Sequence, residues 1–344
     1  MLQEMIGRPA QAPRIVNSGL PEIELSVVIP VYNEEASLEE LYRRLKSVLD
    51  ALGRNYEVIL VNDGSRDRTA EILAKICQRD ARFRALHFAR NFGHQAAVTA
   101  GIDYASGKAI MIMDADLQDP PEIIPEFLKK WEEGYEVVYA IRQGRKENFL
   151  LRAAFKVFYR LLRKVASVDI PVDSGDFGLI DQKVAQVLRQ LPERNRFVRG
   201  LRSWVGFRQI GLEYTRGRRY AGEVKYTLSK RIKFALDGIV SFSHLPLRLA
   251  TYLGLTVSAS SFLLGVIFLI QKLTIGVQTQ GWASTIVVIL FLGGVQLLSI
   301  GIIGEYIARI YDEVKQRPIY ILSDAMNFPD LHQTPTTAAN HKAK

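Results

Sequence analysis

Two long uncharged stretches near the carboxyl end constrain this 344-residue chain more than any other feature. Residues 249–270 run 22 positions without a charged side chain, and residues 282–304 run 23. Each stretch can cross the roughly 30 Å of hydrocarbon in a bilayer as a helix. Buried core helices of a soluble protein are the alternative, but such helices normally carry a polar stripe. The sequence therefore predicts two transmembrane helices joined by a short connector.

Basic residues flank this hairpin asymmetrically. The connector carries a single one, Lys272. The others lie before the first stretch or after the second: Lys230, Arg231, Lys233, Arg248, Arg309, Lys315 and Arg317. Because cytoplasmic segments are enriched in Lys and Arg, we expect both termini in the cytoplasm and the connector outside. This arrangement predicts a two-span protein of the inner or plasma membrane.

Composition and end sequences bound the remaining organisation. A single cysteine, Cys77, cannot form an internal disulfide and fits a reducing compartment. No positively charged start precedes an apolar run, so no cleavable signal peptide is expected. We predict a flexible lead over 1–22, a cytoplasmic domain over 23–228, spans within 248–305, and a cytoplasmic tail over 306–344. The polar composition after Ser323 predicts disorder there.

Short apolar runs in the cytoplasmic domain alternate with helix-like stretches. The runs cover residues 25–31, 58–61, 85–88, 109–113 and 137–141. The helical stretches cover residues 37–51, 68–77, 95–104 and 121–133. This rhythm is typical of an α/β fold with a mostly parallel, doubly wound sheet and helices on both faces. In such folds the ligand lies beyond the carboxyl ends of the strands.

Polar and acidic residues follow four of these runs. The motifs are Pro30-Val-Tyr32-Asn-Glu34, Asn62-Asp63-Gly-Ser, Arg90-Asn-Phe-Gly-His94 and Asp114-Ala-Asp116-Leu-Gln118-Asp. No glycine-rich dinucleotide motif or Walker loop is present, which argues against a dinucleotide enzyme or a P-loop ATPase. Carboxylate and amide oxygens suit Mg²⁺ or Mn²⁺, which can bridge a protein to a diphosphate. The sequence therefore predicts a divalent-metal site at this edge.

Some of these residues also have ordinary structural interpretations. An Asp-x-Asp pair is a weak signal alone, but the buried-strand pattern before Asp114 and Asp116 would aim them into the site. Asp63 could stabilise a turn or cap the helix that begins near Arg68. His94 could be a catalytic base, but the sequence identifies no partner for it, so a structural or helix-starting role is favoured.

Taken together, four motifs resemble family 2 glycosyltransferases. They are Val-Val-Ile-Pro-Val-Tyr-Asn-Glu-Glu at 27–35, Val-Asn-Asp-Gly-Ser at 61–65, Arg-Asn-Phe-Gly-His-Gln-Ala-Ala at 90–97 and Met-Asp-Ala-Asp-Leu-Gln-Asp-Pro-Pro-Glu at 113–122. With the carboxyl hairpin, the resemblance narrows to polyprenyl-phosphate glycosyltransferases, the group of bactoprenol glucosyl transferases and dolichyl-phosphate mannose synthases. It covers about residues 25–320.

The resemblance implies a GT-A fold, a nucleotide-diphosphate sugar donor and Mg²⁺ or Mn²⁺. It also implies inverting transfer onto undecaprenyl or another polyprenyl phosphate, a homotetramer, and a role in the cell envelope such as O-antigen modification. Glucose from UDP-glucose is the first choice of donor, while galactose, N-acetylhexosamines, aminoarabinose and mannose from GDP stay open.

Site residues follow from the same resemblance. Nucleotide contacts are implied at Pro30, Tyr32, Glu34 and Asp63. Metal, diphosphate and sugar-nucleotide contacts are implied at Asp114, Asp116 and Gln118. Phosphate contacts are implied at Arg142, Arg219 and Lys225. The last two belong to a segment that resembles the family pattern Arg-x-x-Gly-x-Ser-Lys-Tyr, with Val224 in place of the serine.

Residues 149–167 have the pattern of a helix in the lipid interface. Apolar residues fall on one face of this helix. On another face, basic residues recur at every fourth position: Arg152, Lys156, Arg160 and Lys164. A soluble amphipathic helix packed on the domain is the alternative. We expect Lys156 to bind the acceptor phosphate. A second interfacial helix is expected over 229–247.

The chemistry of the acceptor bears on whether a base is needed. A phosphate monoester has a second pKa of about 6, so at pH 7 it is already largely a dianion. A strong general base is therefore not required. If one acts, Asp116 and Asp176 are both candidates, and the sequence leaves the choice open.

Three other functions compete with this hypothesis. A processive polysaccharide synthase would carry a Gln-x-x-Arg-Trp motif and more spans, and neither is found. A membrane-tethered nucleotide-sugar sensor or scaffold would bind the donor without transferring the sugar. The net charge of +9 would also suit nucleic acid, but the basic residues cluster near the spans, so anionic lipid is the simpler partner.

Overall fold

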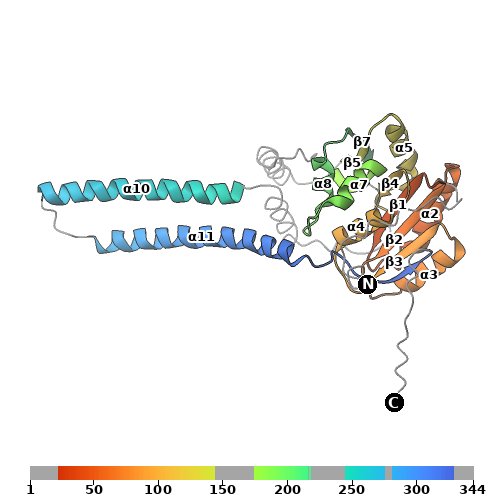
Figure 1. Ribbon diagram of the computed structural model, residues 1–344, viewed down its shortest axis with the longest axis horizontal. Coiled ribbons are helices and arrows are strands. Elements are labelled where there is room, and N and C mark those ends of the chain that lie inside the picture. Colours follow the sequence, from red (N-terminus) through yellow and green to blue (C-terminus); the bar gives the residue numbers. More distant parts are fainter. Residues whose placement is uncertain (1–21, 144–173, 216, 218–244, 276–280, 329–344) are drawn as a thin grey trace, which may run out of the picture. The chain divides into compact units, whose positions relative to one another are not determined.

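The computed structural model describes residues 22–143, 174–215, 217, 245–275 and 281–328 (Figure 1). These residues divide into two units, a mixed α/β domain and a helical hairpin. The interfacial helix predicted over 149–167, and nearly all of the one over 229–247, lie outside the described residues. So do three predicted phosphate-binding residues: Lys156, Arg219 and Lys225.

One sheet organises the α/β domain, with strand order β7-β5-β6-β4-β1-β2-β3-β8. Its parallel part comprises β1 (Leu25–Val31), β2 (Tyr56–Asn62), β3 (Phe83–Phe88) and β4 (Ala109–Ile112). β1 pairs with β2 and β4, and β2 pairs with β3, all in parallel. These strands are the predicted apolar runs, because a strand covered on both faces has few polar side chains. Their carboxyl ends therefore lie at the same edge.

The other part of the sheet departs from the parallel pattern. β6 (Ser174–Asp181) pairs antiparallel with β4 and with β5 (Val137–Gln143). β7 (Gln209–Thr215) then pairs in parallel with β5. Because β6 runs against β4, its first residues lie beside the carboxyl end of β4. This geometry brings the start of β6 to the predicted site.

The predicted helices connect the parallel strands. They are α2 (Leu38–Ala51), α3 (Thr69–Arg79), α4 (His94–Tyr104), and a short 3₁₀ turn η1 (Pro121–Ile123) continued by α5 (Ile124–Glu132). Two further helices, α7 (Gln182–Gln190) and α8 (Val198–Trp204), follow β6. The described part of the domain thus confirms the doubly wound, mostly parallel arrangement.

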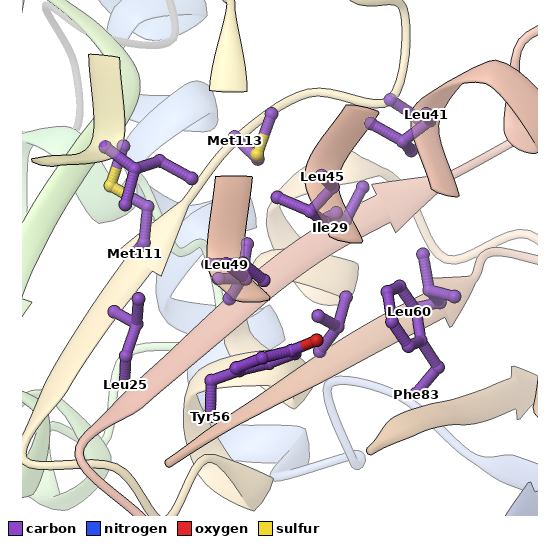
Figure 2. Close-up of a cluster of buried hydrophobic side chains, with 14 of the residues drawn as sticks. Leu25, Ile29, Leu41, Leu45, Leu49, Tyr56, Leu60, Phe83, Met111 and Met113 are labelled. Carbon is purple, nitrogen blue, oxygen red and sulfur yellow. The ribbon is translucent and has the colours of Figure 1, made fainter. Parts of the chain in front are cut away.

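Alternating strand residues pack against helices on opposite faces of the sheet. On one face, Leu41, Leu45 and Leu49 of α2 lie over Leu25 and Ile29 of β1 (Figure 2). Burying each such leucine contributes about 1.5–3 kcal/mol. On the other face, Val28 meets Gly101 of α4 so closely that an added Cβ would lie 2.1 Å from the Cγ1 atom of Val28. The sheet is therefore a fixed platform whose edge can hold a site.

The last described strand corrects a prediction. The segment after Ser323 was expected to be disordered, but β8 (Leu322–Met326) pairs antiparallel with β3 and appears in blue beside it in Figure 1. Its register aligns Asp324 with His87. The strand has no strong apolar pattern because the unpaired backbone edge of β3 supplies the hydrogen bonds that order it.

The second unit is a pair of long helices that contact each other (Figure 1). They are α10 (Leu245–Ile275) and α11 (Trp282–Lys315). By length and composition, Leu247–Phe268 and Ser284–Lys315 could each cross a membrane. Their mean hydropathies are 1.6 and 2.6, and their apolar stretches are not buried within the structure. Phe262 and Leu273 are 76% and 77% exposed. Such a large apolar surface favours contact with lipid over contact with water. α11 continues past residue 304, the expected end of the second span, through a more polar end.

Candidate active site

The loops after β1 and β2 are tied together at the carboxyl edge of the sheet. Asn33 has a positive φ of 54°, a conformation that Asn tolerates. Its backbone N–H donates to Ser65 Oγ at 3.0 Å, and its side-chain Oδ1 accepts from the backbone N–H of Arg66 at 2.8 Å. Beside it, Tyr32 is 40% exposed. The predicted nucleotide residues Pro30, Tyr32 and Glu34 therefore lie on or next to a braced loop.

Asp63 holds the loop that follows β3. Its carboxylate accepts hydrogen bonds from the backbone N–H of Phe92 at 2.7 Å, the backbone N–H of Gly93 at 3.0 Å and Asn91 Nδ2 at 2.9 Å. The residue is 3% exposed, and burial raises the pKa of the carboxyl. In the described structure Asp63 does not cap α3, which follows Arg68. The helix-cap interpretation was wrong, and the role of Asp63 in nucleotide binding stays a prediction.

Gly64 allows the loops after β2 and β3 to meet. It has a positive φ of 65°, and an added Cβ would lie 2.5 Å from the backbone carbon of Arg90. Any side chain there would therefore both strain the backbone and push the two loops apart.

The Asp-x-Asp loop follows β4. Asp116 is 6% exposed, and its Oδ1 accepts the backbone N–H of Gln118 at 3.1 Å. Leu117 has a positive φ of 58°, which is unusual for a branched apolar residue. The carbonyl of Gln118 accepts the backbone N–H of Gly217 at 2.9 Å. The chain just before the predicted Arg219 motif thus contacts this loop.

Several carboxylates meet at Asp114. Desolvation by the surrounding protein, together with the charges of Asp119, Asp176 and Asp116, raises the pKa of Asp114 to about 6 against the opposing effect of His94. A divalent cation would relieve this repulsion. Among the residues that the structure describes, no three His, Cys, Asp or Glu side chains form a metal centre. The donor set fits a Mg²⁺-type site in which one or two carboxylates share the cation with substrate phosphates.

His94 has a partner that the sequence did not reveal. Its Nε2 lies 3.2 Å from Asp176 Oδ2 and 3.9 Å from Asp114 Oδ1. Burial alone would lower the pKa of His94, but the hydrogen bond with Asp176 and the charge of Asp114 raise it to about 9. His94 also begins α4, so the predicted helix-starting role is confirmed. At neutral pH it adds a positive charge beside the acidic loop.

Asp176 gathers polar and cationic groups at the start of β6. Besides His94, it accepts from Gln95 Nε2 at 3.0 Å and Arg199 Nε at 3.4 Å. Burial would raise the pKa of Asp176, but the hydrogen bond with His94 and the charges of Arg199 and Arg202 hold it well below its usual range. A carboxylate with such a low proton affinity is a poor general base. Of the two predicted base candidates, Asp176 is therefore better suited to hold the cations in place.

Arg142 joins the site through a residue that sequence reasoning missed. Its Nε donates to Tyr214 Oη at 3.3 Å, and the Tyr214 hydroxyl donates to Asp119 Oδ1. Asp119 is fully buried. Tyr214 lies on β7, which contains no recognisable sequence motif. Asp119 follows Gln118 in the acidic motif, but the sequence assigned it no role. Arg199 was missed too, and its sole signal was the arginine-rich composition of residues 194–202.

The structure thus brings Asp114, Asp116, Gln118, Arg142 and Asp176 to one edge of the sheet. Pro30, Tyr32, Glu34 and Asp63 lie on or next to the ends of the neighbouring strands β1 and β2. The result is an acidic loop opposed by cations, an arrangement suited to a metal-bridged diphosphate and a second anionic group.

Comparisons with known proteins cover both units. Residues 26–189 match Glycosyl transferase family 2, and residues 245–310 match the GtrB C-terminal hairpin. An uncharacterized glycosyltransferase of Bacillus subtilis (strain 168), YkcC, is 53% identical over 87% of this chain and 93% of its own. The SfII prophage-derived bactoprenol glucosyl transferase of Shigella flexneri is 42% identical over 87% of this chain and 97% of its own.

Solved structures give a more distant likeness. Glucosyl-3-phosphoglycerate synthase from Mycobacterium tuberculosis, in complex with Mn²⁺, uridine diphosphate and phosphoglyceric acid, covers 63% of this chain and 76% of its own. The identity is 19% and the TM-score is 0.44. A likeness at this level supports no conclusion about the ligands of this chain.

Proposed function

We propose that this chain, which belongs to glycosyl transferase family 2 and is a glycosyltransferase, transfers glucose from UDP-glucose to a polyprenyl phosphate. The transfer inverts the anomeric centre and takes place at the cytoplasmic face of the membrane. Undecaprenyl phosphate is the acceptor we expect. The product is a polyprenyl-phosphate sugar.

The observation that carries the proposal is the combination, on one chain, of an acidic and cationic sheet edge with two long apolar helices whose large side chains are exposed. The edge suits a nucleotide diphosphate, and the hairpin suits a substrate that resides in lipid. The relative named a bactoprenol glucosyl transferase is similar along both parts, which supports glucose as the sugar and bactoprenol phosphate as the acceptor.

The acidic and the cationic side chains at this edge have different proposed roles. Asp114, Asp116 and Gln118 would hold a divalent cation, which neutralises the leaving diphosphate when it is bound. His94, Arg142 and Arg199 lie where positive charge can screen two anionic substrates from each other. The acceptor phosphate, already a dianion at neutral pH, attacks without the help of a strong base. The low pKa of Asp176 agrees with this mechanism.

Sheet topology supports the proposed orientation in the membrane. β1 to β7 precede the hairpin and β8 follows it, yet all belong to one sheet. The chain must therefore leave and return on the same side of the bilayer, which requires an even number of crossings. Together with the basic residues that flank the hairpin, this supports a cytoplasmic location for the domain and β8.

The test incubates detergent-solubilised protein with Mg²⁺, undecaprenyl phosphate and radiolabelled nucleotide sugars, then counts the label extracted into organic solvent. We expect transfer from UDP-glucose, and a parallel series with Mn²⁺ identifies the preferred cation. Transfer from another nucleotide sugar would change the proposed sugar but leave the proposed transfer to a polyprenyl phosphate intact. Donor binding without transfer to any polyprenyl phosphate would instead favour the sensor or scaffold function. Successive addition of sugars would indicate a processive synthase.

A further inference from the structure

The segment Tyr320–Phe328, here named the return strap, follows the hairpin and packs along β3. Its backbone pairs with β3 from Ala85 to Phe88. In addition, the Ser323 Oγ donates a hydrogen bond to the carbonyl of His87 at 3.1 Å. At its far end, Asn327 Nδ2 donates to the carbonyls of Cys77 and Phe83 at 2.9 and 2.7 Å. The strap is thus anchored at both ends.

The near end of the strap contacts the loop that Asp63 holds. The carbonyl of Ile321 accepts the backbone N–H of Ala89, the first residue after β3, at 3.0 Å. The Tyr320 ring lies flat on Phe88, with centroids 5.2 Å apart and an interplanar angle of 9°. The Tyr320 hydroxyl donates to Asp103 Oδ2 at 2.9 Å, which fixes the ring from the side of α4.

A continuous set of contacts leads from this ring to the site. Phe88 meets Phe92 edge to face, with centroids 5.7 Å apart. The backbone N–H of Phe92 donates to Asp63 Oδ1 at 2.7 Å. The guanidinium of Arg90 lies 4.2 Å from the centroid of the Phe92 ring and covers it. Tyr320, Phe88, Phe92 and Asp63 therefore form one packed path from the return strap to the predicted nucleotide position.

We propose that Tyr320 is a positioning residue for the donor nucleotide, acting through Phe88 and Phe92 on Asp63. This inference rests on the proposed function, because it takes Asp63 to contact the nucleotide. Tyr320 itself does not touch the substrate. It sets the position of the backbone amides at 92 and 93 and hence the orientation of the Asp63 carboxylate. Side chains along such packed paths can change the coupling between sites even when they touch neither ligand.

The experiment measures the binding of UDP with Mg²⁺ by calorimetry on the full-length, detergent-solubilised protein. Tyr320→Ala removes the stack and the hydroxyl, and we expect it to weaken UDP binding about threefold to tenfold. Tyr320→Phe keeps the stack and is expected to bind UDP nearly as the wild type does. Should Tyr320→Ala not fold, Phe88→Leu removes the same stack from β3 and has the same expected effect. In transfer assays, the KM for the donor should rise while the KM for the polyprenyl phosphate stays unchanged.

Asn327→Gly is the matched control. It keeps the positive φ of 62° accessible and removes the anchor at the far end of the strap. We expect a lower Tm with unchanged UDP binding. Equal weakening by Asn327→Gly, or wild-type affinity in Tyr320→Ala, would overturn the inference and leave the proposed function intact. If the wild type binds no nucleoside diphosphate at all, the proposed function fails and the inference fails with it.

Discussion

The acidic side of the site and its cationic side are built differently. Asp114 and Asp116 lie on one short loop after one strand, so neighbouring residues set their relative position. The cations come from separate elements: Arg142 from β5, His94 from α4 and Arg199 from α8. They are placed by contacts with distant residues, chiefly Asp176 and Tyr214. The acidic side thus depends on local sequence, and the cationic side depends on the completed fold.

The largest expected effect is on the acidic side. Asp116→Asn removes a charge from the predicted metal position, and we expect kcat/KM for sugar transfer to fall about 10²- to 10³-fold or more. The Tm should change little, because the asparagine keeps an Oδ1 that can accept the backbone N–H of Gln118. Asp312→Asn, on the exposed surface of α11, is the control. Near-normal transfer by Asp116→Asn at saturating Mg²⁺ would remove Asp116 from the metal site.

On the cationic side, Asp176→Asn should lower kcat/KM about tenfold to a hundredfold, because His94 and Arg199 lose the carboxylate that places them. Combined with Arg199→Ala, it should be non-additive by about 0.5–3 kcal/mol. Asp181→Asn, at the other end of β6, is the matched control and should affect stability more than turnover. Additive effects would show that Asp176 acts independently of Arg199, as a base would.

A smaller effect is expected from Tyr214→Phe, which removes the hydroxyl between Arg142 and Asp119. The loss should reduce the free energy of unfolding by about 1.5–3 kcal/mol, since a hydrogen bond to a charged group is removed. Thermal unfolding measures this loss of stability. The KM for polyprenyl phosphate measures whether Arg142, which loses its contact with the hydroxyl, still binds phosphate. Tyr42→Phe, in which the ring still packs on Phe83, serves as control. An unchanged Tm would mean that this hydroxyl is dispensable.

The smallest effect concerns pH. The pKa of His94 is raised to about 9 in the folded chain, above its ordinary value of 6.5. Its stabilising contribution is therefore complete below pH 6.5 and is lost as the pH rises through 9. The difference in Tm between wild type and His94→Gln should shrink over that interval. A difference that grows with pH would contradict the ion pair with Asp176.

The same contrast explains what the sequence could predict. Apolar runs and strand-end motifs located β1 to β4 and their loops, because those elements depend on neighbouring residues. The resemblance supplied the GT-A fold, which the family match and the mixed sheet confirm. Tyr214 and Arg199 carry no local pattern, since their partners lie 95 and 23 residues away. β8 escaped prediction because the edge of β3, rather than its own composition, makes it a strand.

The pairing of β3 with β8 also sets the order in which the protein can be completed. Ser323 and His87 are separated by 236 residues, and both apolar helices lie between them. During synthesis, the edge of β3 that pairs with β8 stays unpaired until β8 has emerged from the ribosome. If both helices span a membrane, as proposed, a chain that inserted only one of them would leave β8 on the opposite side of the bilayer from β3. Completion of the sheet would then require both helices to be inserted, and a misinserted chain would keep the backbone edge of β3 unpaired.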